Sequence, residues 1–171
     1  MSTSAEQLRL RAVGYADPVA QQLVDRVQQE YVVRYGGPDA AVVDPAEFSP
    51  PLGRFLVAEL DGVTAGCGGW RALGDGRAEL KRMYVEPHAR RRGVARTLLT
   101  ELERSAAAAG QRQLVLNSGP QQPEALALYA RAGYAPVAGF GVYADEPGAV
   151  FLGKDLTAAD DGPEEVDAWA S

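Results

Sequence analysis

Six consecutive residues, Arg90-Arg91-Arg92-Gly93-Val94-Ala95, separate an extended segment from an amphipathic helix. The extended segment runs from Glu79 to Val85 and stops at Glu86-Pro87, whereas apolar residues recur at helical spacing from Ala95 to Ala109. Glycine at the start of a helix lets a ligand approach N–H groups that have no partner inside the helix. Those groups, with the positive end of the helix dipole, favour a phosphate. The pattern predicts an anion-binding turn for a phosphorylated cofactor, and a solvated basic helix start is the alternative interpretation.

Composition and charge fit a single folded domain. The chain has 171 residues, of which 46% are hydrophobic and 23% charged, as in ordinary globular proteins. Its net charge of −6 argues against a general attraction to nucleic acid or to an anionic membrane. Cys67 is the single cysteine and His88 the single histidine, so no intrachain disulfide and no Cys- or His-rich metal site is expected. The chain has no apolar run of membrane-spanning length and no signal-peptide pattern, which predicts a cytoplasmic protein.

The periodicity predicts an α/β domain of the α+β type. One helix starts at Pro18 after an Asp17 N-cap and ends at Gly36. Residues 38–51 contain four prolines and are expected to form a loop with at most one short helical turn. The order of elements indicates a mixed, mostly antiparallel sheet of about seven strands flanked by helices, in one domain over residues 1–156 with a flexible acidic tail at 157–171. Strands are predicted at 8–13, 54–60, 63–73, 79–85, 113–117, 134–138 and 149–156, and further helices at 95–109 and 123–132.

Two motifs together resemble the GNAT superfamily of acyl-CoA-dependent N-acetyltransferases. The strand at 79–85 is followed by Arg90-x-x-Gly93-x-Ala95, which matches the family turn Arg/Gln-x-x-Gly-x-Gly/Ala in full. A helix and a strand then lead to Leu128-Tyr129-Ala130-Arg131-Ala132-Gly133-Tyr134, the second motif. The resemblance covers residues 54–156 well and implies a GNAT-like fold.

The resemblance implies acetyl-CoA as the cofactor. The pantetheine arm would pair with the backbone of Met83, Tyr84 and Val85, where the strands would splay, and the Met83 N–H would polarise the thioester carbonyl. Many relatives have Asn where this chain has Gln122, so its contact to the cofactor is expected to differ from theirs. The pyrophosphate would be held at the turn, by Arg90, Arg91, Arg92, Gly93, Val94, Ala95 and Arg96.

Two side chains are candidates for acid–base chemistry by the same resemblance. Tyr129 matches the general acid that protonates the departing CoA thiolate; an amphipathic core residue is the alternative interpretation. Glu79 lies where some family members carry a general base, and a surface ion pair between Glu79 and Lys81 is equally compatible with the sequence.

The implied activity is transfer of an acetyl group to an amine, on a small molecule or a peptide, by direct attack. The acceptor would enter between residues 38–51 and 137–147, where Phe140-Gly141-Val142-Tyr143 and Asp145-Glu146 suggest an aromatic and acidic wall for a cationic amine; ordinary loop packing is the alternative. A non-catalytic acyl-CoA sensor is the rival function. A nucleic-acid module is disfavoured by the net acidity, and a monomer and a homodimer are both left open.

Overall fold

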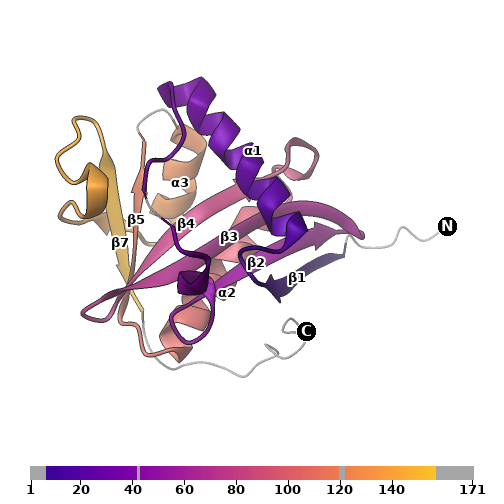
Figure 1. The fold of residues 1–171 in the computed structure, drawn as a ribbon, viewed down its shortest axis with the longest axis horizontal. Helices are drawn as coiled ribbons and strands as arrows, with labels where there is room; N and C mark the ends of the chain where they lie inside the picture. The colour runs from indigo at the N-terminus through magenta and orange to yellow at the C-terminus, as the bar shows by residue number, and fades with distance from the viewer. Residues whose placement is uncertain (1–6, 42, 120–121, 157–171) are drawn as a thin grey trace.

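A seven-stranded sheet forms the centre of the computed structural model, which describes residues 7–41, 43–119 and 122–156 (Figure 1). The strand order is β1-β2-β3-β4-β5-β7-β6. Neighbouring strands are antiparallel except β4 and β5, which are parallel. The strands are β1 (Leu8–Val13), β2 (Gly53–Leu60), β3 (Val63–Gly74), β4 (Arg77–Val85), β5 (Gln113–Ser118), β6 (Ala135–Pro136) and β7 (Val150–Asp155).

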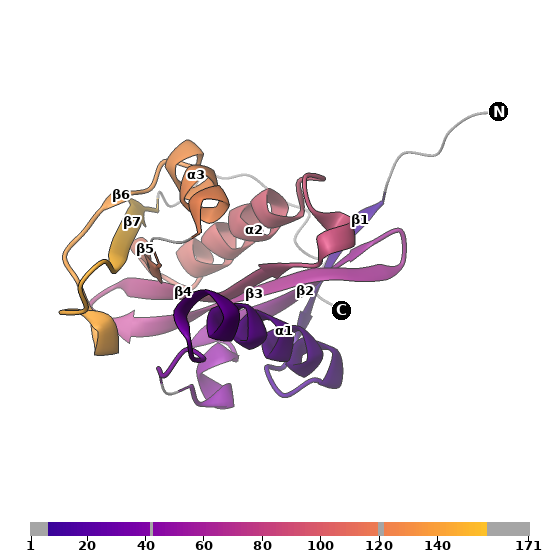
Figure 2. The same cartoon turned by 90° about the horizontal axis from the view of Figure 1, so that it is seen from above.

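Helices cover both faces of the sheet. Figure 2 shows α1 (Pro18–Tyr35) on one face and both α2 (Val94–Ala108) and α3 (Pro123–Arg131) on the other. Three short 3-10 helices lie in the connections: η1 (Pro45–Phe48), η2 (Pro87–Ala89) and η3 (Gly141–Tyr143). The mixed, mostly antiparallel sheet with flanking helices confirms the predicted fold class. None of the helices in the described ranges has the length and apolar character needed to cross a membrane.

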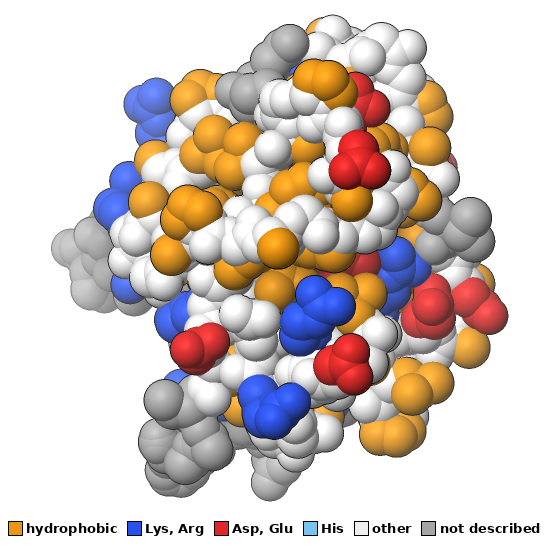
Figure 3. Space-filling model, turned by 90° about the vertical axis from the view of Figure 1, so that its left-hand side faces the viewer, with side chains coloured by type: hydrophobic (Ala, Val, Ile, Leu, Met, Phe, Trp, Pro, Cys, Tyr) orange, Lys and Arg blue, Asp and Glu red, His pale blue; other side chains and the backbone are white. Residues whose placement is uncertain are grey.

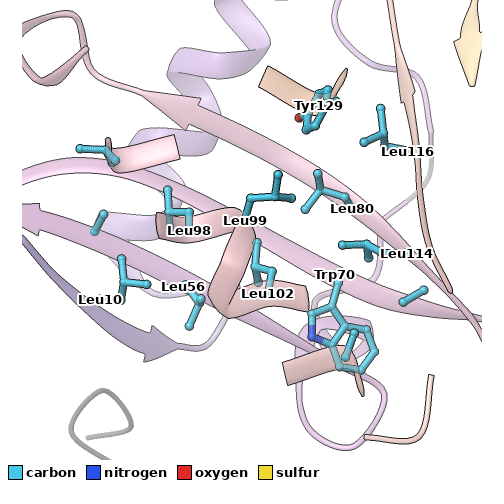
Figure 4. Close-up of a cluster of buried hydrophobic side chains, with 14 of the residues drawn as sticks. Leu10, Leu56, Trp70, Leu80, Leu98, Leu99, Leu102, Leu114, Leu116 and Tyr129 are labelled. Atoms are coloured by element: carbon cyan, nitrogen blue, oxygen red, sulfur yellow. The ribbon is translucent and has the colours of Figure 1, made fainter. Parts of the chain in front are cut away.

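The hydrophobic side chains of the strands form two clusters, one on each face of the sheet, because successive side chains of a strand point to opposite faces. On β2, Leu56 and Ala58 pack toward α2, whereas Phe55 and Val57 pack toward α1. The α2-side cluster is shown in Figure 4 and includes Trp70, whose indole N–H donates to the Ser105 hydroxyl at 3.0 Å. The sheet is therefore buried on both faces, and its central strands are held rigidly.

The helix boundaries follow the predicted caps. The Asp17 carboxylate accepts from the Val19 N–H at 2.8 Å, and Gly36 ends α1 in the left-handed conformation. The predicted strand at 134–138 is shorter in the structure, where β6 is Ala135–Pro136 and the following Val137 N–H still donates to the Phe151 carbonyl at 3.0 Å. Residues 157–171, predicted as a flexible tail, lie outside the described residues.

Candidate active site

A cleft opens where β4 and β5 separate. The two strands pair at only three positions, the last being Glu79 opposite Val115, although β4 continues to Val85 and β5 to Ser118. The resemblance implied this splaying. The cleft has a volume of about 1070 Å³, enough for a cofactor-sized ligand. It is lined on β4 and β5 by Glu79, Leu80, Lys81, Arg82, Met83, Tyr84, Val85, Leu116, Asn117 and Ser118.

A bulge in β4 shapes this edge of the cleft. Cys67 pairs with Tyr84 while Gly69 pairs with Lys81, so β4 has one extra residue between these pairs. Arg82 takes up the extra length with a left-handed φ of 62°. The paired positions on β3 and β5 leave Met83 without an opposite residue on either strand. Met83 thus lines the cleft in a stretch where the ladder is interrupted.

The bulge also brings two consecutive cations to one carboxylate. Lys81 and Arg82 would point to opposite faces of a regular strand, yet both contact Oδ2 of Asp39, at 2.8 Å from Lys81 Nζ and 2.6 Å from Arg82 Nη1. The Tyr143 hydroxyl donates to Oδ1 of Asp39 at 3.1 Å. Burial acts to raise the pKa of Asp39, but the Lys81 and Arg82 charges outweigh it and hold that pKa below its ordinary value.

Glu79 is buried and paired, and it also lines the cleft. Its Oε1 accepts from Arg71 Nε at 3.1 Å, and its Oε2 lies 3.8 Å from Lys81 Nζ. Glu79 and Lys81 thus form an ion pair, but a buried one and not the surface pair that was the alternative interpretation. Arg71 continues the chain of charges to Glu47, at 2.9 Å. Glu79 is therefore held by two cations at the wall of the cleft.

Tyr129 lies on α3 at the edge of the α2-side cluster, near Leu116 (Figure 4). Its ring meets Tyr134 edge to face at 5.7 Å, and its side chain lines the cleft. Burial, with a smaller contribution from Tyr31, raises the pKa of Tyr129 above its ordinary value. The phenol therefore stays protonated, as a proton donor must be.

The predicted anion-binding turn contributes residues to the lining of the cleft. Gly93 caps α2 with φ +81° and has open space around it, so a ligand can approach the first N–H groups of the helix. The Arg90 side chain faces the protein instead, since it donates to the Val85 carbonyl at 3.0 Å and to Glu30 at 2.7 Å. Of the turn residues named from the sequence, Arg90, Arg91, Gly93, Val94, Ala95 and Arg96 line the cleft, and the exposed Arg92 does not.

Gln122 and the two entrance segments, residues 38–51 and 137–147, complete the outline of the site. Gln122 lines the cleft at the start of α3, and its side-chain oxygen accepts from the Ser118 hydroxyl at 3.1 Å. The entrance segments contact each other, because the Ala40 N–H donates to the Tyr143 hydroxyl at 2.7 Å. Tyr143 and Glu146 line the cleft, whereas Asp145 and Phe140 do not, and the Phe140 ring packs edge to face on Phe151 at 5.1 Å.

Sequence reasoning did not single out the cleft residues of α1 and its C-terminal end, which include Tyr31, Arg34, Tyr35 and Asp39. The first three are spaced i, i+3 and i+4, which places them on one face of α1. That spacing was a usable signal, but it also fits ordinary packing of α1 on the sheet. Asp39 follows the Pro-containing end of the helix and carries no pattern that distinguishes it from a surface turn residue.

Comparisons with known proteins agree with this geometry. The family model of the acetyltransferase (GNAT) family matches residues 20–134. An IAA acetyltransferase of Azospirillum brasilense is 35% identical over 136 residues, which are 79% of this chain and 89% of that protein. A solved structure assigned to the acyl-CoA N-acyltransferases, from Klebsiella pneumoniae, superposes with a TM-score of 0.74 at 27% identity and covers 88% of this chain and 99% of that one. The paia N-acetyltransferase of Thermoplasma acidophilum, solved with coenzyme A, shares the fold with a TM-score of 0.65 at 16% identity, over 87% of this chain and 99% of that one.

Proposed function

The chain belongs to the acetyltransferase (GNAT) family and is an acyltransferase, and we propose that it transfers the acetyl group of acetyl-CoA to an amine by direct attack. The observation that carries the proposal is one continuous cleft between β4 and β5. This cleft joins the turn at Gly93, the interrupted ladder at Met83 and the buried phenol of Tyr129. These features correspond to a diphosphate site, a carbonyl-polarising donor and a proton donor.

The residues at the cofactor end fit coenzyme A. Exposed N–H groups at the start of α2 and the side chains of Arg91 and Arg96 would hold the diphosphate. The backbone of β4 from Met83 to Val85 would pair with the pantetheine arm. Arg90 would position the turn, because its side chain is bonded to Val85 and Glu30. Acetyl-CoA supplies the acetyl group as a thioester.

The first prediction concerns Gly93. An L-residue in the left-handed conformation costs roughly 1–2 kcal/mol, so Gly93→Ala should distort the turn and weaken acetyl-CoA binding about 5- to 30-fold by calorimetry. Gly110→Ala is the matched control, since Gly110 follows the other end of α2 with φ +93° and equally open surroundings. Similar loss of affinity in both variants would contradict a role for Gly93 in cofactor binding.

The transfer step balances as follows. The neutral amine forms a C–N bond to the acetyl carbon while the C–S bond breaks, and the Met83 N–H stabilises the negative charge on the carbonyl oxygen. The amine gives up a proton toward Glu79, through water, and the departing thiolate takes one from Tyr129. The products are an acetylated amine and the free thiol of coenzyme A.

A second prediction tests Glu79 as the base. An amine of pKa ~10.4 is about 0.04% neutral at pH 7, so Glu79→Gln should lower kcat/KM about 10- to 100-fold near neutral pH and much less near pH ~10, where the amine needs no base. Glu59→Gln is the control, because Glu59 is another strand carboxylate paired with an arginine, Arg11, at 3.1 Å. A loss that does not depend on pH would assign Glu79 a structural role.

The proposed function is tested by mass spectrometry of the products formed from acetyl-CoA and a broad mixture of amines. A mass gain of one acetyl group on any amine, dependent on the protein, is the expected result. A non-catalytic sensor would bind coenzyme A, detected by calorimetry, and acetylate none of them. An absence of binding would overturn the proposal at its first step.

A further inference from the structure

The cleft has a distinct wall on the α1 side of the sheet, which we call the acceptor wall: Tyr31, Arg34, Tyr35, Asp39, Lys81 and Tyr143. It lies across the sheet opening from the Gly93 turn, which belongs to α2 on the other face (Figure 2). The end of α1 reaches the end of β5, because a side chain at Gly119 would collide with the Tyr35 hydroxyl. The acceptor wall is therefore a built surface that spans α1, β4 and the connection before β7.

The buried carboxylates of this region are already neutralised. Asp39 is paired with Lys81 and Arg82, and Glu79 with Arg71 and Lys81. A cationic acceptor such as a polyamine would have to displace these short contacts. Of the other carboxylates that line the cleft on this side, Glu30 is paired with Arg90 at 2.7 Å and Glu146 is exposed. Figure 3 shows basic and acidic side chains interspersed with hydrophobic ones on the face toward β7. These paired carboxylates favour an acceptor other than a polycation.

Arg34 also lines the acceptor wall. It lies one turn after Tyr31 and is half-buried. A guanidinium has five N–H donors in a planar fork, so it can bind a carboxylate while keeping another partner. This chemistry fits an acceptor that carries a carboxylate of its own.

The same wall offers flat apolar surface. The rings of Tyr31 and Tyr35 lie 6.2 Å apart and tilted by 47°, and Tyr143 lines the cleft beyond them with Pro38 and Pro147. Tyrosine faces pack well on aromatic rings and leave their hydroxyls for polar contacts. An aromatic or apolar group on the acceptor would be buried there.

We propose, on the basis of the acetyl transfer proposed above, that the acceptor is a small amine carrying both a carboxylate and an aromatic or apolar group, the chemistry of a free aromatic amino acid. Arg34 binds its carboxylate. Tyr31, Tyr35 and Tyr143 hold its side chain, and its amine points to the opening between β4 and β5. Loss of the carboxylate therefore removes one charged contact while leaving the reacting amine unchanged.

The test compares amino acids with the amines that lack only the carboxylate. Release of coenzyme A is followed with phenylalanine and phenethylamine, tyrosine and tyramine, tryptophan and tryptamine, and with spermidine. We expect kcat/KM to be more than about tenfold higher for at least one amino acid than for its amine, the effect of one charged hydrogen bond. Arg34→Gln should bring this ratio close to one, Arg34→Lys should restore part of it, and Arg9→Gln, at an exposed arginine of β1, should not change it.

Each other result overturns the inference in a recognisable way. A preference for the decarboxylated amines or for spermidine would reject a carboxylate-bearing acceptor while leaving acetyl transfer intact. A ratio that Arg34→Gln leaves unchanged would reject the role of Arg34. Failure to acetylate any of these compounds would reject the acceptor class, and the product analysis with the broad amine mixture would then show whether acetyl transfer itself has failed.

Discussion

In a Tyr129→Phe variant we expect kcat to fall about 100- to 10,000-fold, the usual contribution of a positioned general acid, with the Kd of acetyl-CoA changed less than about threefold. The hydroxyl is the single group removed, and the ring keeps its edge-to-face contact with Tyr134. Stopped-flow or steady-state release of coenzyme A gives kcat, and calorimetry gives Kd. Equal losses in kcat and in cofactor affinity would assign Tyr129 to packing.

Tyr134→Phe is the matched control for this experiment. Tyr134 belongs to the same cluster and is equally buried, but its hydroxyl donates to Glu103 at 2.7 Å and it does not line the cleft. We expect this variant to lose stability with little change in kcat. A comparable fall in kcat in both variants would contradict the assignment of the proton donor.

The pH dependence follows from the sign of the pKa shift. Burial raises the pKa of Tyr129, so its protonated, donating form persists above pH ~10, where an unperturbed tyrosine titrates. Tyr129 should therefore cause no alkaline fall in kcat below that pH in the wild type. A descending limb that starts near neutral pH and vanishes in Tyr129→Phe would mean that a nearby positive charge lowers the pKa of this phenol, against the effect of its burial.

Local rules were sufficient to predict most of the fold and the cofactor end of the site. Asp17, Gly36 and Gly93 mark helix ends through capping chemistry that operates within a few residues. Alternation in β2 and β4 predicts which face each side chain takes as long as the strand is regular. The Gly93 turn and Tyr129 were found because each belongs to a contiguous motif.

The acceptor side could not be predicted because it depends on one irregular residue. Regular alternation would separate Lys81 from Arg82, and the bulge at Arg82, with its left-handed φ, brings both to Asp39. A bulge leaves little trace in a sequence when the residue that adopts positive φ is not glycine. Tyr143 joins this cluster from 104 residues further along the chain, a distance over which no local pattern carries information.

The Asp39→Ala variant should lose about 3–5 kcal/mol of unfolding free energy, the cost of leaving one member of a buried ion pair without its partner. The side chain of Arg82 is 3% exposed and that of Lys81 is 9% exposed, so water cannot replace the lost carboxylate. Because a domain of this kind has roughly 5–15 kcal/mol in total, urea denaturation should show a large shift in midpoint. Asp39→Asn keeps the hydrogen-bonding shape without the charge, so its unfolding free energy should lie between those of the wild type and of Asp39→Ala.

The same variant gives a pH test of the contact, with Asp145→Ala as its control. Attraction from Lys81 and Arg82 outweighs burial and places the pKa of Asp39 below that of an unfolded aspartate, near ~3.9. The stability that Asp39 contributes is therefore fully present above about pH 4 and is lost as the pH falls through the folded pKa. The difference in unfolding free energy between wild type and Asp39→Ala should be constant from about pH 5 to 8 and should shrink in stronger acid.

Asp145 is exposed, so its replacement should change stability by less than about 0.5 kcal/mol at any pH. If both variants lost equally little, the Asp39 cluster would not hold the acceptor wall together, and the bulge at Arg82 would need another explanation.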